Sequence, residues 1–182
     1  MVIEPITERI ERARGLDGLA AKVQGWVRAL VPPGPVEDML RGQPIGHPLH
    51  PALVTLPIGA WTSALAADVL GEPAAARKLT ALGCVAALPA ALAGGVDWVS
   101  TDGAQRRVGL VHAMANDTAL ILFMLSWRAR RRGRRGRGLV DGLAAAGVLT
   151  VGAWLGGHLA YAQGVGVDLT GFAARHAAAE PD

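Results

Sequence analysis

Four of the five histidines in this chain stand in short motifs that also contain proline, glycine or asparagine. Within these motifs polar residues recur three or four positions apart, which places their side chains on one face of a helix. Imidazole binds metal ions and haem iron, and it exchanges a proton near neutral pH. A cofactor, metal or proton-handling site is therefore expected from Gly46-His47-Pro48-Leu49-His50-Pro51, His112 with Asn116, and Gly156-Gly157-His158 with Tyr161.

Haem b is one cofactor that these residues could bind. It needs two imidazoles at matching depth on facing helices, small residues beside the ring and cations for its propionates. We expect His112 and His158 at comparable depth, with paired glycines before His158 and with Arg106 and Arg107 just outside. The spacing therefore predicts haem ligation by His112 and His158.

Three other roles stay open for the same cluster. A mononuclear metal ion would take three or four imidazole or carboxylate ligands, and a quinone pocket would need one or two histidines and a carboxylate. Alternatively, the side chains only hold the helices in register through interhelical hydrogen bonds. The cofactor-binding candidates are His47, His50, His112, His158, Asn116 and Tyr161, and the metal-ligand candidates are His47, His50, Asp97, His112 and His158.

Charge-free stretches identify the elements that must position these side chains. Of the 182 residues, 51% are hydrophobic and only 18% are charged, and the mean hydropathy is +0.31. A helix needs about 20 mostly apolar residues to cross a bilayer, and these stretches lack the charged face of a soluble helix. We therefore predict an all-α integral membrane bundle of four transmembrane helices, at about 52–70, 77–97, 108–127 and 140–162.

Basic residues orient the four helices. Arg77 and Lys78 lie in the first loop and seven arginines lie between 128 and 137, whereas the 98–107 loop has only Arg106 and Arg107. Because short cytoplasmic loops carry the excess of Lys and Arg, we expect the 128–137 loop in the cytoplasm and both termini outside a multi-pass plasma membrane protein. Four histidines then lie on the outer side, and Asp68 pairs with the cytoplasmic cations. We expect the arginine run to be a topology signal that also meets anionic lipid, rather than a nucleic-acid site.

The first 40 residues have a different pattern. Apolar residues recur there among charged ones, which predicts an amphipathic helix that ends at Val31-Pro32-Pro33-Gly34 and lies on the membrane or against another protein. We divide the chain into this amphipathic helix with its linker (1–41), a four-helix transmembrane domain (42–168) and a flexible C-terminal tail (169–182). His47 is the expected N-cap of the first transmembrane helix, because Pro48 suits a first turn.

Familiar catalytic signatures do not occur in the sequence. It has no nucleophile elbow, phosphate loop, dinucleotide fingerprint or H-E-x-x-H motif, so we do not expect an independent enzyme. The single cysteine, Cys84, excludes an intramolecular disulfide and a cysteine-ligated iron–sulfur site within the chain.

The histidine motifs and their surroundings resemble a bacterial membrane protein family, domain of unknown function 2231 (DUF2231). The resemblance covers about residues 15–170, and its most specific part is the His-Pro-x-His-Pro opening that begins at His47. It implies a compact four-span membrane domain. Actinobacterial relatives are often fused to, or encoded beside, a Rieske iron–sulfur domain, which implies a redox setting. The resemblance continues through Pro57-Ile58-Gly59-Ala60-Trp61, Asp68, Asp97-Trp98, the stretch from Arg106 to His112, Asn116, and the stretch from Gly156 to Tyr161.

Together these features predict a membrane subunit or anchor of an electron-transfer system. This chain has no Cys-x-His pair of its own, so a Rieske cluster would have to come from a partner. The predicted system is linked to a Rieske protein and quinol, and the outer histidine cluster binds haem b or a quinone. The alternative is a structural membrane protein whose histidines form a polar network or bind a metal ion, with no catalysis of its own.

Overall fold

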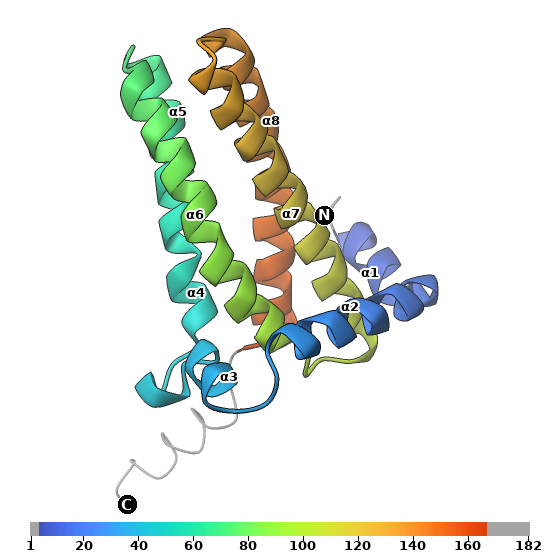
Figure 1. The fold of residues 1–182 in the computed structure, drawn as a ribbon. Coiled ribbons are helices and arrows are strands. Elements are labelled where there is room, and N and C mark those ends of the chain that lie inside the picture. The colour runs from blue at the N-terminus through green and yellow to red at the C-terminus, as the bar shows by residue number, and fades with distance from the viewer. Residues whose placement is uncertain (1–3, 167–182) are drawn as a thin grey trace, which may run out of the picture.

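The computed structural model describes residues 4–166, and within that range the secondary structure is helical. Figure 1 shows a bundle of long helices with short N-terminal helices across one end. Two 3₁₀ turns, Arg14–Leu16 and Gln43–Ile45, occur in the N-terminal part. The helices are α1 (Glu4–Arg12), α2 (Asp17–Leu30), α3 (Pro35–Leu40), α4 (Leu49–Leu53), α5 (Thr55–Val69), α6 (Pro73–Trp98), α7 (Gly103–Arg131) and α8 (Arg135–Gly157), with α8 continued by a π-helical turn at His158–Ala162.

Among the described residues, four helices are long and apolar enough to cross a membrane, which confirms the predicted all-α membrane bundle. They run over Leu49–Val69, Pro73–Trp98, Gly103–Arg131 and Arg135–Ala162. Each is longer than the predicted span, and in the third and fourth the extra length comes from charged turns that continue the helix beyond the apolar stretch. The first is divided into α4 and α5 at Val54, one residue after Leu53. Pro57 has no N–H to donate to the Leu53 carbonyl, which accounts for this break.

The start of α4 differs from the expectation for His47. The N-cap residue is Pro48 rather than His47, and no side chain caps the helix. His47 therefore lies before the helix, exposed to solvent, while His50 falls in the first turn. Proline fits this N-cap because its ψ of 128° is extended and its own nitrogen needs no partner.

The N-terminal segment packs on the bundle itself. It forms α1 and α2, joined by a 3₁₀ turn, rather than one continuous helix. Ala20 of α2 packs with Trp98 and Leu110, and Ile10 of α1 packs against the buried side chains of Val108 and Leu155. We call the end of the bundle that this segment covers the histidine end, and the opposite end, with the 70–72 and 132–134 hairpins, the arginine end (Figure 1).

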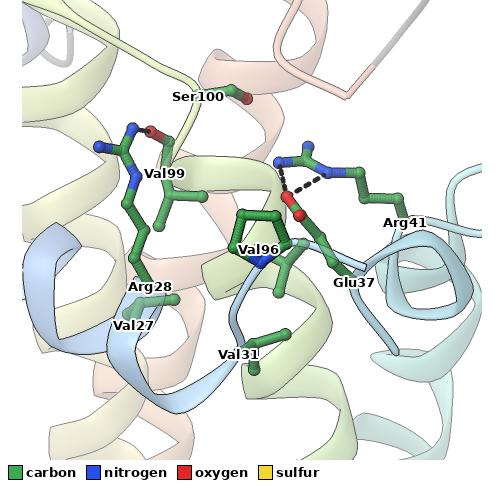
Figure 2. A pocket seen from close by; sticks show the side chains of 9 residues that line it. Val27, Arg28, Val31, Glu37, Arg41, Val96, Val99 and Ser100 are labelled. Atoms are coloured by element: carbon green, nitrogen blue, oxygen red, sulfur yellow. Dashed lines mark hydrogen bonds and ion pairs between the residues drawn. The ribbon is translucent and has the colours of Figure 1, made fainter. Parts of the chain in front are cut away.

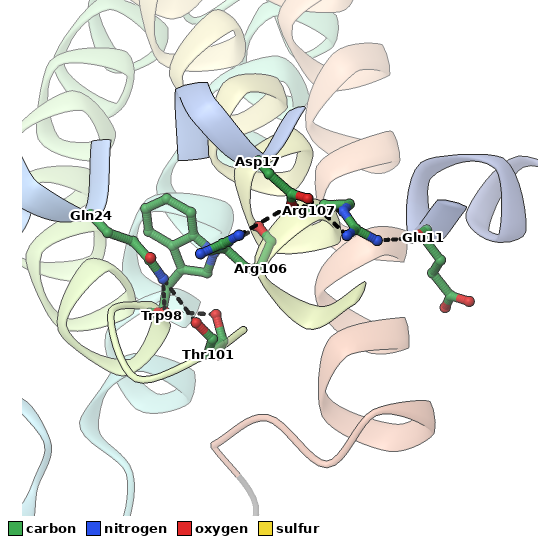
Figure 3. A network of polar contacts seen from close by, with 7 residues as sticks. All are labelled: Glu11, Asp17, Gln24, Trp98, Thr101, Arg106 and Arg107. Carbon is green, nitrogen blue, oxygen red and sulfur yellow. Dashed lines mark hydrogen bonds and ion pairs between the residues drawn. The ribbon is translucent and has the colours of Figure 1, made fainter. Parts of the chain in front are cut away.

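Polar contacts fix α1 and α2 to the histidine end (Figure 3). The Arg107 guanidinium donates to both carboxylate oxygens of Asp17 at 2.8 and 2.9 Å, and its Nη1 donates to the Glu11 carbonyl at 2.5 Å. Arg106 also donates to Asp17, at 3.2 Å. Farther along α2, the Gln24 amide donates to the carbonyls of Trp98 and Thr101. The hydrogen bonds from Arg107, followed by those from Arg106, lower the pKa of Asp17 to about 2.

Because this pKa is lowered, the stabilisation by Asp17 is present above its unfolded pKa of about 4 and is lost as the pH falls toward 2. We expect Asp17→Asn to lower the unfolding temperature by the same amount from pH 8 to pH 5. Below about pH 4 the gap between the two proteins should shrink. Thermal unfolding of both proteins in detergent at each pH measures this gap, and a gap that widens on acidification would contradict the assignment.

A small pocket lies where the N-terminal segment meets α6 (Figure 2). Its charged groups are already bound, since Arg28 donates to the Val99 carbonyl at 2.8 Å and Arg41 donates to the Glu37 carboxylate at 2.7 Å. We therefore interpret this pocket as a packing gap between the N-terminal segment and α6, and not as a ligand site. Its lining consists of Val27, Arg28, Val31, Pro33, Glu37, Arg41, Val96, Val99 and Ser100.

The transmembrane helices form two similar halves, offset by 62 residues. Helices α5 and α7 end at Val69 and Arg131, and α6 and α8 begin at Pro73 and Arg135. The two hairpins share their backbone geometry: Gly71 and Gly133 have φ values of 78° and 73°, which glycine adopts without strain. In both hairpins the residue after the glycine donates its backbone N–H to a carbonyl of the preceding helix. Glu72 donates to Ala67 at 2.8 Å, and Arg134 donates to Ala129 at 3.0 Å.

Three pairs of equivalent residues touch each other across the two halves. The His50 and His112 rings lie 6.5 Å apart between centroids, and the Trp61 and Phe123 rings stack at 4.1 Å with an angle of 9°. At the arginine end Arg130 donates to both carboxylate oxygens of Asp68, at 2.5 and 2.7 Å, as the predicted pairing of Asp68 required. Equivalent positions meet only along an axis that relates the halves, so a pseudo-two-fold axis runs along the bundle.

The middle of the bundle is an apolar core around this axis. Trp61, Phe123 and Ala145 are buried there. The thiol of Cys84 packs at the edge of the same cluster, as a small apolar residue does. The two halves are thus joined by a histidine pair, an aromatic stack and an ion pair in succession.

Candidate cofactor site

The histidine pair lies on the pseudo-two-fold axis at the histidine end. His50 is in the first turn of α4, and its Nδ1 lies 2.8 Å from the carbonyl oxygen of Ala90 in α6. His112 is in α7, and its Nδ1 lies 2.8 Å from the carbonyl oxygen of Gly152 in α8. Each carbonyl comes 40 residues after its histidine. The two rings are therefore held in the same way, each by the second helix of its own half.

These carbonyl contacts assign the tautomer of both rings. A carbonyl oxygen only accepts a hydrogen bond, so each Nδ1 carries a proton, and in the neutral ring Nε2 keeps the lone pair. Within the described residues, the Nε2 of His50 has no hydrogen-bond partner. A neutral imidazole whose Nδ1–H is fixed by a carbonyl is the usual form of a metal-ligating histidine.

Glycines make room for both imidazoles. A methyl group on Gly94 would lie 2.7 Å from Cε1 of His50, and one on Gly156 would lie 2.9 Å from Cε1 of His112. Each glycine stands four residues after the carbonyl that holds the ring, in α6 and α8 respectively. The Gly-Gly pairs at 94–95 and 156–157 are therefore equivalent parts of the two halves.

We expect Gly94→Ala and Gly156→Ala each to destabilise the protein by about 1–3 kcal/mol, because the new methyl group overlaps an imidazole ring. Gly147→Ala, in the exposed middle of α8, is the matched control, since no atom lies within 4 Å of its added methyl group. Denaturant unfolding followed by tryptophan fluorescence measures all three variants. Equal stability of the three would show that the rings do not need this space.

Asn116 supports the second histidine of the pair. Its Nδ2 donates to the backbone carbonyl of His112 at 2.8 Å and lies 3.2 Å from the Nε2 of the same ring. Gly152 leaves the space for this amide, since a methyl group there would lie 2.7 Å from its Oδ1. The predicted grouping of His112 with Asn116 on one helix face is present, and the amide group lies against the imidazole.

His158 has a different partner from the one expected. Its Nε2 lies 2.8 Å from the Glu11 carboxylate of α1, which also accepts a hydrogen bond from Gln163 at 2.8 Å. The hydrogen bond with His158 is the main cause of the lowered pKa of Glu11. The structure therefore pairs His112 with His50, and uses His158 to bind the N-terminal segment.

The remaining predicted site residues are not gathered around the histidine pair. His47 is exposed ahead of α4, and the Tyr161 side chain is 88% exposed. Asp97 is half-buried near the end of α6. Over residues 4–166, no three His, Cys, Asp or Glu side chains lie close enough to hold a metal ion. The five metal-ligand candidates are thus not assembled into one site by this chain.

Sequence reasoning missed two features that position the site. The 62-residue offset is present in the sequence, because His50 and His112, Gly94-Gly95 and Gly156-Gly157, and Gly71 and Gly133 all share it. Recognising this repeat would have predicted that His50 and His112 are equivalent residues that meet on the axis between the halves. The second feature, the contact of Glu11 with His158, spans 147 residues and has no signal in local spacing.

A comparison with protein-family models finds a match over residues 46–169, to the predicted membrane protein family DUF2231. The chain belongs to the DUF2231 family. The DUF2231 region begins at Gly46, so it contains both histidines of the pair and both halves of the bundle, whereas helices α1 to α3 precede it. No curated protein and no solved structure matches the chain.

Proposed function

We propose that this protein is a membrane-embedded electron-transfer subunit in which His50 and His112 bind one redox-active metal centre, a b-type haem. One observation carries the proposal: two imidazoles from different halves lie 6.5 Å apart on the pseudo-two-fold axis, and each is fixed through Nδ1. Ionisable residues inside membrane spans are costly and usually mark function. A pair that serves packing alone would not need the lone pair that His50 keeps free on its Nε2.

The separation of the rings would allow His50 and His112 to hold one metal ion between them. With metal–nitrogen bonds of about 2 Å, two imidazoles that share a metal would have ring centroids at most about 6 Å apart, close to the 6.5 Å seen here. Gly94 and Gly156 let the two imidazoles lie close against α6 and α8, since a methyl group at either position would overlap a ring. When bound, the haem supplies one-electron redox chemistry.

Arg106 adds a group suited to a haem propionate. It lies six residues before His112 on α7, or roughly 9 Å along the helix axis. Its Nε is buried without a hydrogen-bond partner in the described part of the chain, although its Nη2 donates to Asp17. A carboxylate is the acceptor that such a guanidinium N–H prefers.

The electron-transfer partner in this proposal is a Rieske-type protein, as the family resemblance implies. Cys84 is the single cysteine of the chain and packs in the apolar core, so an iron–sulfur cluster has to belong to the partner. The arginine end is the cytoplasmic one in this arrangement, because the excess of basic residues lies there. The histidine end then faces outward toward the partner.

An absorption spectrum of the purified protein tests the haem assignment. The protein is expressed in membranes with haem supplementation and purified in detergent. We expect a Soret band that shifts on reduction, with one haem per chain. The absence of a Soret band in both redox states would overturn the haem assignment, and metal analysis of the same sample would identify a non-haem metal.

The competing function is a structural one, favoured by the fact that each histidine bridges two helices through Nδ1. It predicts that His50→Ala and His112→Ala lower stability without removing any bound cofactor. A quinol pocket is a further outcome, since a quinol hydroxyl can donate to a free Nε2. In that case solvent extraction of the purified protein recovers a quinone and the spectrum shows no haem.

A further inference from the structure

The arginine end carries basic side chains that the fold does not use. The aspartates at this end already form ion pairs, Asp68 with Arg130 and Asp141 with Arg137. The exposed Glu72 adds one further negative charge. The other basic side chains of the two hairpins are exposed and have no carboxylate partner among the described residues. We call these seven residues the basic surface: Arg77, Lys78, Arg128, Arg131, Arg132, Arg134 and Arg135.

The basic surface lies at the depth of lipid headgroups. Helix α7 has 29 residues and is therefore about 43 Å long, which exceeds the ~30 Å hydrocarbon core. Its last turn must then project into the headgroup layer. In this turn the guanidinium carbon of Arg131 lies 5.0 Å from the centre of the Trp127 ring. Tryptophan is enriched at this interface, which supports the assigned depth.

We propose that the basic surface is a binding site for the phosphate groups of anionic phospholipids. A guanidinium group binds a phosphate through two parallel hydrogen bonds. The ion pair between Asp68 and Arg130 holds the two hairpins at the same end, so basic residues from both halves can reach the headgroups of one annulus of lipids. Bound phosphates also relieve the repulsion among unpaired cations, which the protein itself leaves uncompensated.

Native mass spectrometry of the detergent-purified full chain tests this proposal. The probes are phosphatidylglycerol and phosphatidylcholine with the same acyl chains. We expect the protein to retain phosphatidylglycerol preferentially and to lose this preference at high ionic strength. The double variant Arg134→Gln/Arg135→Gln should weaken phosphatidylglycerol binding roughly 10- to 30-fold.

The matched control is Arg9→Gln/Arg14→Gln, which removes two exposed cations from the opposite end of the bundle. It should leave phosphatidylglycerol binding within about twofold of the original protein, since these side chains lie far from the basic surface. Equal retention of the two lipids, or equal loss in both double variants, would overturn the proposal. Displacement of the lipid by inorganic phosphate, or tighter binding of a short RNA, would assign the surface to another ligand.

Discussion

Replacing either His50 or His112 by alanine is expected to abolish haem binding at concentrations that saturate the original protein. In the proposed site each imidazole supplies one of the two iron ligands. Among the described residues, no neighbouring side chain takes the place of a histidine that has been removed. Loss of outer-shell partners alone lowers metal affinity about 10- to 100-fold, so loss of a ligand should cost at least that much. Haemin titration followed by the Soret absorbance measures the affinity of each variant.

His158→Ala is the matched control for these two variants. Its imidazole belongs to the same end of the bundle but is bound to Glu11, and so it should not affect haem affinity. If His158→Ala removed the haem while His50→Ala retained it, the ligands would be those that helix depth suggested, His112 and His158. Equal retention in all three variants would leave the histidines with a structural role only.

Asp68→Ala is expected to destabilise the protein by about 3–5 kcal/mol, because it leaves the Arg130 charge buried without its partner. The side chains of Arg130 and Asp68 are only 4% and 12% exposed. Arg130 also donates to Ser126 and to the Gly138 carbonyl, which fixes its position when the ion pair forms. Denaturant unfolding in detergent measures the loss.

Two further variants separate the ion pair from general damage at the same site. Asp68→Leu combined with Arg130→Met removes both charges, and we expect most of the stability to return. Asp68→Arg with Arg130→Asp exchanges two equivalent positions of the repeat. In this exchanged variant we expect stability to return only when Ala76→Gly is added. Gly138 leaves space for Arg130, since a methyl group there would lie 2.6 Å from its Cγ. The equivalent position in the other half is the buried Ala76, whose methyl group would occupy the space that the new arginine needs. Equal stability of Asp68→Ala and the original protein would contradict a buried ion pair.

The sequence was sufficient for the fold class and the four membrane helices because charge-free stretches report directly on the solvent around a helix. The pairing of Asp68 with a cation of the arginine end could also be predicted, because Asp68 and the arginine run lie at the same end of their helices. The exact helix limits did not, since α7 continues as a helix through Arg128 to Arg131, where charge had marked the end of the apolar span.

The pairing of the histidines could not be obtained from depth. A helix turns by about 100° per residue, so two residues at the same depth can face different neighbours. His112 and His158 were expected at comparable depth, yet His112 faces His50 and His158 faces Glu11. To predict which partner each histidine faces, one would need to know how each helix is rotated about its own axis. The packing between α6, α7 and α8 sets this rotation. The offset of 62 residues between His50 and His112 is the sequence signal that carries this information.

The packing of the N-terminal segment was also beyond local patterns. Its amphipathic spacing was compatible with a membrane surface, another protein or this bundle. Contacts of Arg107 with Asp17 and of His158 with Glu11 decide among these, and each joins residues at least 90 positions apart. Even so, Trp26 and Leu30 remain exposed on the outer side of α2, at 69% and 70%.

The electron paramagnetic resonance spectrum of the oxidised, haem-loaded protein tests the assignment of His50 and His112 as a ligand pair most directly. Two axial imidazoles give low-spin ferric iron, and loss of either leaves a high-spin, five-coordinate centre. We predict a low-spin signal in the original protein and in His158→Ala, and a high-spin signal for any haem that His50→Ala or His112→Ala still retains. A high-spin signal in the original protein, or a low-spin signal unchanged in His50→Ala, would contradict the assignment.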